Sequence, residues 1–257
     1  MLSQWNDIVL ALDATSLRIY EWADWRARGA SAPYAVFPHE GRIEELAARA
    51  LAAKPRARLP FFNRVHLVVG NPWACLGILP WQAGLYSQTA WDAYARAWFA
   101  ARTQRGQWSV RVQDEKYGAA RLSAALSADI LAGIRRACDS AGWRLVSARD
   151  ELSSLLSRHA AIVRQPDWCL ALAERNVVTC LFRANGAWRD LVMLPRTREN
   201  AEEWLATAAL LSDLTISNPV YIGGVDLPDL PRGAQRLEGW HTRLLPACGS
   251  DQREQRI

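Results

Sequence analysis

The chain has 257 residues and a mass of 28.8 kDa, half of its residues are hydrophobic, and its formal net charge is +5. A disordered chain would be poorer in apolar side chains, so the composition indicates a globular protein of one large domain or two lobes. No stretch approaches about 18 uncharged apolar residues, and no basic segment precedes the first short apolar run. We therefore expect neither a transmembrane helix nor a signal peptide.

The cysteines and the basic residues argue against a disulfide-rich protein, a zinc protein and a P-loop NTPase. The five cysteines are odd in number and never spaced Cys-x-x-Cys, so neither a disulfide framework nor a zinc site is indicated. Of 31 basic residues only Lys54 and Lys116 are lysines, and neither stands in the Gly-Lys-Ser/Thr sequence of a P-loop. The arginines are interleaved with acids rather than gathered in a stripe, which makes nucleic-acid binding a minor alternative.

Hydrophobic patterning in the first 165 residues predicts strands at 7–12 and 17–22, joined by the turn Asp13-Ala14-Thr15-Ser16. The run YAVF at 34–37 allows a third strand. Further along, the pattern predicts an amphipathic helix at 42–53, a buried strand at 64–70, a tryptophan-rich loop at 73–82, a helix over about 89–104 capped by Ser87, strands at 108–113 and 121–126, a helix capped by Ser127 and ended by Gly142, a strand at 143–148 and a helix at 150–162.

The second part of the chain opens in the same way. Strands are predicted at 168–174, 177–184 and 187–195, and Asn185-Gly186 is a strong hairpin signal between the last two. A helix at 198–211 and a strand at 219–226, which contains paired glycines, follow. Each half thus begins with hairpin strands and continues with helix and strand, which predicts a two-lobed α/β protein with mixed sheets.

Few residues stand out as catalytic. Asp13 could be a carboxylate of a ribonuclease H-like metal site, but its place in a turn favours an Asx role in which it accepts backbone N–H groups. His66 lies in a predicted strand and is interpreted as a sheet residue rather than a catalyst. No Gly-x-Ser-x-Gly sequence supports nucleophilic catalysis.

Four segments resemble the actin-like ATPase fold: IVLALDATSLRIYEW, VHLVVGNPWACLGILPWQAG, WCLALAERNVVTCLFRANGAWRDLVMLP and VYIGGVD. More narrowly, residues 7–226 resemble the actin-fold assembly proteins of bacterial pilus and secretion machines, namely PilM-like proteins and the cytoplasmic domains of GspL-like proteins. The Pro-Trp pair at 80–81, before the aromatic helix, is the most characteristic detail. The resemblance implies a two-lobed actin-like (ribonuclease H-like) fold, with a first lobe at 1–165 that carries an inserted subdomain at about 71–126 and a reduced second lobe at 166–248. The polar composition of 249–257 predicts a disordered tail.

The resemblance also implies where a nucleotide would bind. In nucleotide-binding members each phosphate hairpin carries an Asp-x-Gly turn, whose acid holds the metal and whose glycine lets backbone amides approach phosphate. Here the first turn has no glycine, and the second, with Ala171, Ala173 and Glu174, has neither glycine nor aspartate. We therefore expect no cofactor and no metal; if MgATP does bind, the resemblance assigns it to Asp13, Thr15, Ser16, Gly223 and Gly224.

The favoured hypothesis is a non-catalytic cytoplasmic scaffold of a type IV pilus or type II secretion-like assembly. It would be recruited to the inner membrane by a segment of a membrane partner, with the assembly ATPase as a second partner. Tryptophan is a frequent interface anchor, and the groove for the partner is assigned to Trp73, Trp81, Trp91 and Trp98. The alternatives are a nucleotide-dependent actin-like ATPase of the same machinery and, in another class, a nucleic-acid-associated factor that uses the arginine surplus.

Overall fold

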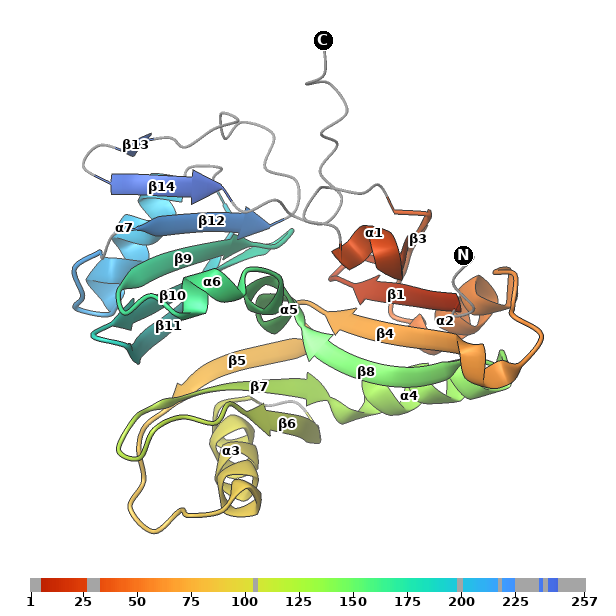
Figure 1. Ribbon diagram of the computed structural model, residues 1–257, viewed down its shortest axis with the longest axis horizontal. Coiled ribbons are helices and arrows are strands. Elements are labelled where there is room, and N and C mark those ends of the chain that lie inside the picture. Colours follow the sequence, from red (N-terminus) through yellow and green to blue (C-terminus); the bar gives the residue numbers. More distant parts are fainter. Residues whose placement is uncertain are drawn as a thin grey trace. The chain divides into compact units, whose positions relative to one another are not determined.

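The computed structural model describes residues 6–26, 33–103, 106–197, 201–216, 219–224, 236–237 and 240–244. By its internal contacts the chain divides into two compact units (Figure 1). Within the described residues, unit 1 comprises the residues up to Ala74 and Leu126–Ser154, and unit 2 comprises Cys75–Ala125, called the insert below, and the residues from Leu155 onward. The lobe and insert boundaries expected from the sequence stay a prediction, and the tail at 249–257 lies outside the described residues.

Unit 1 is built on a five-stranded mixed sheet in the order β3-β2-β1-β4-β8. The strand β1 pairs antiparallel with β2 and parallel with β4, and β4 pairs parallel with β8. Parallel neighbours need a crossover, which the helices α2 and α4 supply. The bounds are β1 Asn6–Leu12, β2 Ser16–Glu21, α1 Trp22–Arg26, β3 Ala35–Pro38, α2 Ile43–Ala52, the short 3-10 helix η1 Pro60–Phe62, β4 Asn63–Val69, α4 Ala128–Ser140 and β8 Arg144–Asp150.

Side chains of β1 alternate between the two faces of this sheet, as the period of a strand requires. Ile8, Leu10 and Leu12 join α2 and α4 in the main apolar core of the unit. On the opposite face, Val9 and Ala11 contribute to a smaller cluster that includes Trp25 of α1. The continuous apolar run 8–12 therefore reflects burial on both faces.

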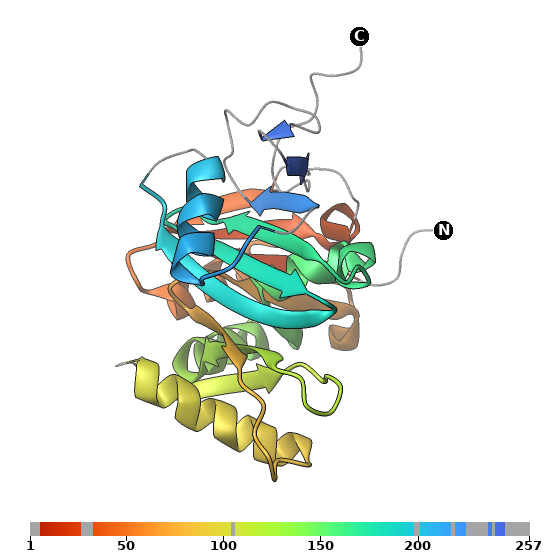
Figure 2. The same cartoon turned by 90° about the vertical axis from the view of Figure 1, so that its left-hand side faces the viewer.

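Unit 2 holds two sheets, a six-stranded one in the order β11-β10-β9-β12-β14-β13 and a three-stranded one in the order β5-β7-β6. The helix α7 packs on one face of the larger sheet, and α3 runs along the smaller one (Figure 2). The bounds are β5 Ala74–Leu79, α3 Gln88–Arg102, β6 Trp108–Val112, β7 Arg121–Ser127, α5 Glu151–Arg158, α6 Ala160–Val163, β9 Trp168–Ala173, β10 Val177–Ala184, β11 Ala187–Pro195, α7 Ala201–Leu211, β12 Val220–Gly224, β13 Arg236–Leu237 and β14 Trp240–Leu244.

Local signals in the sequence correspond to local structure. Ser87 accepts a hydrogen bond from the Ala90 amide at the start of α3, and Ser127 does the same for Ile130 at the start of α4. Gly142 after α4 has a φ of 70°. Asn185 and Gly186 have φ values of 55° and 70°, as a two-residue hairpin turn with both central residues left-handed requires. The helix expected at 150–162 is split into α5 and α6.

The prediction of a tryptophan-rich loop at 73–82 is wrong. Residues Ala74–Leu79 form the strand β5, which pairs with β7. Gly77 stands in the middle of this strand, and glycine weakens a strand pattern. Ser123 Oγ donates to the Gly77 carbonyl across the pair of β5 and β7 at 3.0 Å. Gly77 is needed because a Cβ there would lie 2.6 Å from the Trp98 ring.

Two predicted elements reach past the described residues. Positions 198–200 of the expected helix and 225–226 of the expected strand lie outside the described part of the chain, where the structure has α7 from Ala201 and β12 up to Gly224. Within the described part, no helix is long and apolar enough to span a membrane.

The cap of α3 gives a direct test of the local argument. Ser87→Ala removes the acceptor that the Ala90 amide uses at 3.1 Å, and we expect a loss of about 1 kcal/mol in the free energy of unfolding. Ser87→Asn keeps an N-cap acceptor and should retain most of the stability. Urea denaturation of the three proteins measures both effects, and an equal loss in the two variants would contradict the capping role.

Candidate functional site

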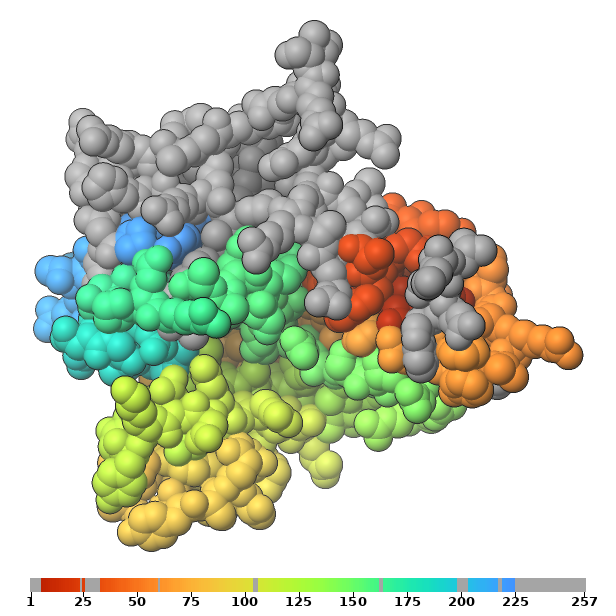
Figure 3. Space-filling model, viewed as in Figure 1, coloured from red at the N-terminus to blue at the C-terminus, as the bar shows by residue number. Residues whose placement is uncertain are grey.

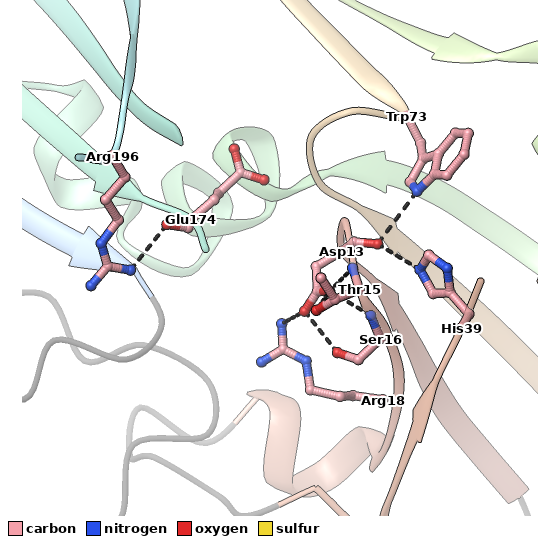
Figure 4. Close-up of polar contacts among 8 residues, drawn as sticks. All are labelled: Asp13, Thr15, Ser16, Arg18, His39, Trp73, Glu174 and Arg196. Atoms are coloured by element: carbon pink, nitrogen blue, oxygen red, sulfur yellow. Dashed lines mark hydrogen bonds and ion pairs between the residues drawn. The ribbon is translucent and has the colours of Figure 1, made fainter. Parts of the chain in front are cut away.

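The turn between β1 and β2 carries the densest polar network in the described part of unit 1 (Figure 4). Asp13 Oδ1 accepts hydrogen bonds from the amides of Thr15 at 2.8 Å and Ser16 at 2.7 Å, and from Thr15 Oγ1 at 3.2 Å. Asp13 Oδ2 accepts from Ser16 Oγ at 2.8 Å and from Arg18 Nη2 at 2.7 Å. Five donors thus converge on one carboxylate, which confirms the Asx role expected from the sequence.

The backbone of this turn is held by two rings from other segments. The Asp13 carbonyl accepts a hydrogen bond from Trp73 Nε1 at 3.3 Å and lies 2.9 Å from His39 Nε2. The His39 amide in turn donates to the Thr15 carbonyl at 2.9 Å. Trp73, assigned from the sequence to a partner groove, therefore braces the Asp13 turn and packs against the core of unit 1.

Asp13 remains charged in this environment. Its side chain is 11% exposed, and burial by itself raises the pKa of the carboxyl group. The amide of Thr15, the positive charge of Arg18 and the donors of Ser16 outweigh burial, so the pKa lies below its ordinary value of 3.8. Asp13 of the turn and Arg18 of β2 therefore form an ion pair, called the closed ion pair below, in which the guanidinium group of Arg18 compensates the negative charge.

The glycine pair of unit 2 lies at the end of β12, beside β9. Gly223 pairs with Leu172 and Gly224 with Ala173. Gly224 has a φ of 139°, and a Cβ there would lie 2.0 Å from the Ala173 carbonyl oxygen. Close approach of two backbones therefore accounts for this glycine by itself.

The turn between β9 and β10 contains no aspartate at the position that would correspond to Asp13. Glu174 is buried, its amide donates to the Val177 carbonyl at 2.8 Å, and its carbonyl accepts from Arg196 Nη1 at 3.0 Å (Figure 4). The assignment of Asp13, Thr15, Ser16, Gly223 and Gly224 to a nucleotide stays a prediction. The structure brings the first three together in unit 1, and in unit 2 it pairs Gly223 with Leu172 and Gly224 with Ala173.

Three of the four assigned tryptophans gather in the insert. Trp91 is 1% exposed and its Nε1 donates to the Leu85 carbonyl at 3.0 Å, so it packs the core of the insert. Trp81 contacts the Trp91 ring at a centroid distance of 5.8 Å, and Trp98 packs on β5 over Gly77. A role for these side chains in partner binding stays a prediction.

Two exposed tyrosines, which the sequence analysis did not single out, extend this aromatic group to the surface. Tyr117 is 77% exposed and meets Trp81 edge to face at 4.6 Å, which sets the loop at 113–120 beside the loop at 80–87. Tyr86, in the second of these loops, is 80% exposed. Figure 3 shows the surface of the insert in yellow to yellow-green. The available signal in the sequence was that both tyrosines stand between predicted helices and strands, where loops are expected.

Glu115 makes the polar contacts that join the described part of the insert to the larger sheet of unit 2. Trp188 Nε1 on β11 donates to Glu115 Oε1 in the loop at 113–120 at 2.9 Å. Arg183 on β10 stacks over the Trp188 ring at 4.5 Å and places Nη1 3.9 Å from the same carboxylate. Trp168 meets Trp188 edge to face at 5.6 Å. The Glu115–Trp188 contact therefore links segments far apart in the sequence.

Other reactive groups have structural partners. Asp150, a buried acid that the sequence analysis passed over, ends β8 and accepts the Ser153 amide at 2.7 Å, which caps α5; burial raises its pKa. Burial raises the pKa of the Cys138 and Cys180 thiols to about 12, so both stay protonated at neutral pH. Among the described residues, no group of three or more His, Cys, Asp or Glu side chains could hold a metal ion.

The element order and the mixed sheets define an α/β protein with the actin-like ATPase fold, and comparison with solved structures confirms this prediction. The PilM-PilN type IV pilus biogenesis complex is 12% identical in sequence, with a TM-score of 0.53 over 86% of this chain and 82% of that chain. The cytoplasmic domain of EpsL, an inner membrane component of the type II secretion system of Vibrio cholerae, is 9% identical, with a TM-score of 0.51 over 97% and 87%.

A third similar structure is a Bacteroides thetaiotaomicron protein with an actin-like ATPase fold and unknown function, 9% identical, with a TM-score of 0.55 over 88% of this chain and 84% of that chain. No family model matches the chain, and no curated protein matches it in sequence. At these identities the likeness establishes the fold, and the activity has to be argued from this chain's own residues.

The closed ion pair predicts how unit 1 responds to substitution. Asp13→Asn replaces an acceptor oxygen by an N–H donor facing other donors, and we expect a loss of about 2–3 kcal/mol in the free energy of unfolding at pH 7. Because the folded-state pKa is depressed, the advantage of the wild-type protein is present above pH 3.8 and is lost as the pH falls through the folded-state value.

Denaturant titrations at pH 7 and at the lowest pH where both proteins fold measure this difference. Asp139→Asn, at an exposed position of α4, serves as the control and should change stability little. Equal stability of Asp13→Asn and Asp139→Asn would contradict the role of the turn.

Proposed function

We propose that the chain is a non-catalytic scaffold of a type IV pilus or type II secretion-like assembly and that it binds a segment of an inner-membrane partner. The shared fold supports the proposal, because one similar structure is a complex of PilM with PilN and another is the cytoplasmic domain of an inner membrane component. The observation that carries the non-catalytic part is the closed Asp13 turn.

A carboxylate offers about four lone-pair sites, and five donors already point at that of Asp13. A magnesium ion with its waters would need these lone pairs and would meet the Arg18 guanidinium 2.7 Å from Oδ2. The turn also lacks the glycine that would let backbone amides approach a phosphate. The residues present therefore do not fit a nucleotide-bound metal, and no hydrolytic step is assigned to them.

Unit 2 supports the same proposal. The strand β9 carries alanine at 171 and 173, where a metal-holding acid would be expected, and Gly224 is accounted for by its packing on Ala173. The Glu174 carbonyl is held by Arg196. Each feature that the resemblance links to nucleotide either is missing or serves the fold.

The partner surface is proposed at the aromatic loops of the insert. Tyr86 and Tyr117 are exposed, and Trp81 beneath Tyr117 is held by Trp91. Aromatic side chains of this kind give a large contact area at low cost in side-chain entropy. Recruitment of the chain from the cytoplasm to the inner membrane, and contact with an assembly ATPase as a second partner, are parts of the same proposal.

Thermal unfolding with and without millimolar MgATP tests the non-catalytic part. A ligand at 100 times its dissociation constant adds about 2.7 kcal/mol, which raises a melting temperature by several degrees. We expect no shift relative to ATP with a chelator. A clear, magnesium-dependent shift would overturn the proposal in favour of the nucleotide-dependent ATPase.

Site-specific photo-crosslinking tests the partner surface. A photoreactive phenylalanine replaces Tyr117 or Tyr86 in cells that carry the assembly machine, and the matched control replaces Tyr34, which is 60% exposed in unit 1. We expect a light-dependent adduct with an integral inner-membrane protein from positions 117 and 86 only. No adduct at these positions, or the same adduct from position 34, would argue against this surface.

A further inference from the structure

A β-bulge in unit 1 brings a serine to a histidine. In the parallel pair of β4 and β8, Val65 is opposite Leu145 and His66 is opposite Ser147, so Val146 is the extra residue and is 37% exposed. Bulges turn the following side chain to a new direction. Here Ser147 Oγ lies 2.7 Å from His66 Nδ1.

One face of the His66 ring is covered by α1. The indole of Trp22, the first residue of α1, lies parallel to the imidazole with a centroid distance of 3.7 Å and an interplanar angle of 14°. The same helix buries Trp25 against Val9 and Tyr20 of the sheet, and it lies beside β1 in unit 1 (Figure 1). Trp22 and His66 thus form a contact between the helix and the sheet face.

The hydrogen bonding of the ring fixes its neutral form. Nε2 of His66 is buried and has no hydrogen-bond partner among the described residues. A buried N–H without an acceptor is rarer in proteins than a bare acceptor, which favours the tautomer whose Nδ1–H donates to Ser147 Oγ. Ser147 then accepts rather than loses a proton, so this pair is not a nucleophile with its base.

A second proton on the ring would be badly placed. It would sit on Nε2 as an N–H with no acceptor, next to charges from three strands: Asp7 on β1, Arg64 on β4 and Arg149 on β8. Arg64 already holds Asp7 through two hydrogen bonds, one of them from Nε to Oδ1 at 2.6 Å. The charge on the ring would thus be attracted by one carboxylate, which already accepts hydrogen bonds from Arg64, and repelled by two guanidinium groups.

We infer that the stack of His66 on Trp22 is an acid-sensitive contact that holds α1 on the sheet of unit 1. Protonation requires that water reach the buried Nε2. In this inference the opening that admits water is a displacement of Trp22, the ring stacked on the imidazole, and this displacement loosens α1 and uncovers Val9 and Tyr20. Burial lowers the pKa of His66, and Arg64 and Arg149 lower it further while Asp7 raises it. The closed form is therefore favoured above pH 6.5 and weakens as the pH falls below that value.

Hydrogen exchange of the segment 20–26 between pH 7.5 and 5.5, corrected for the intrinsic rate, tests this inference. In the wild-type protein we expect protection to fall by about tenfold per pH unit below 6.5, until the folded-state pKa is reached. His66→Phe keeps a flat ring under Trp22 and should remove the acid response. His39→Gln replaces the histidine at the Asp13 turn of the same unit, and this control variant should retain the acid response of the segment 20–26.

An NMR titration of the His66 ring in the wild-type protein gives a result that does not depend on any variant folding. A pKa below 6.5 is expected, and an ordinary value would overturn the inference. An acid response of α1 that is the same in His66→Phe would also overturn it, because the loosening would then have another cause.

Discussion

The Asp13 carboxylate is the charge around which the first hairpin is organised. A buried carboxylate is tolerated only when donors compensate its lost hydration, and here they come from the turn itself and from Arg18 on β2. The carbonyl of the same residue is reached by Trp73, which follows β4, and by His39, which follows β3. One residue therefore ties three segments of unit 1 together, and the groups that could bind a ligand are used for this purpose.

The chain has 13 tryptophans, and arginine supplies nearly all of its basic residues. Side chains of the two types contact one another in unit 2. Guanidinium groups stack on indole rings at distances of 3.9 to 5.9 Å, an arrangement in which the ring quadrupole attracts the cation. The pairs are Arg102 with Trp98, Arg121 with Trp91, Arg183 with Trp188 and Arg196 with Trp204. These four arginines contribute to packing on indole rings, which weakens the hypothesis that the arginine surplus forms a surface for nucleic acid.

How far the sequence could predict the structure depended on the distance between interacting residues. Helix caps such as Ser87 and the hairpin turn at Asn185-Gly186 involve residues two to three positions apart, so both could be predicted from the sequence. The Asx role of Asp13 could be predicted for the same reason, because the amides that it accepts belong to Thr15 and Ser16. The strand β5 could not be predicted, because Gly77 interrupts its apolar pattern, and the contact that accounts for this glycine, with the Trp98 ring, lies elsewhere in the sequence.

The candidate site followed the same rule. The missing glycines could be seen in the sequence, whereas the pairing of Arg18 with Asp13 depends on the register of the hairpin and emerged only from the structure. The exposed positions of Tyr86 and Tyr117 depend on how two loops of the insert meet, which periodicity does not encode.

The Glu115–Trp188 contact has a consequence for synthesis on the ribosome. Its two residues are 73 positions apart, and chains grow at about 5–20 residues per second, so Glu115 waits roughly 4–15 s before its partner has been made. During that interval the carboxylate of Glu115 lacks both Trp188 and Arg183. The loop at 113–120 therefore reaches its final contacts only after β10 and β11 have been synthesised, later than the strands of the insert that it joins.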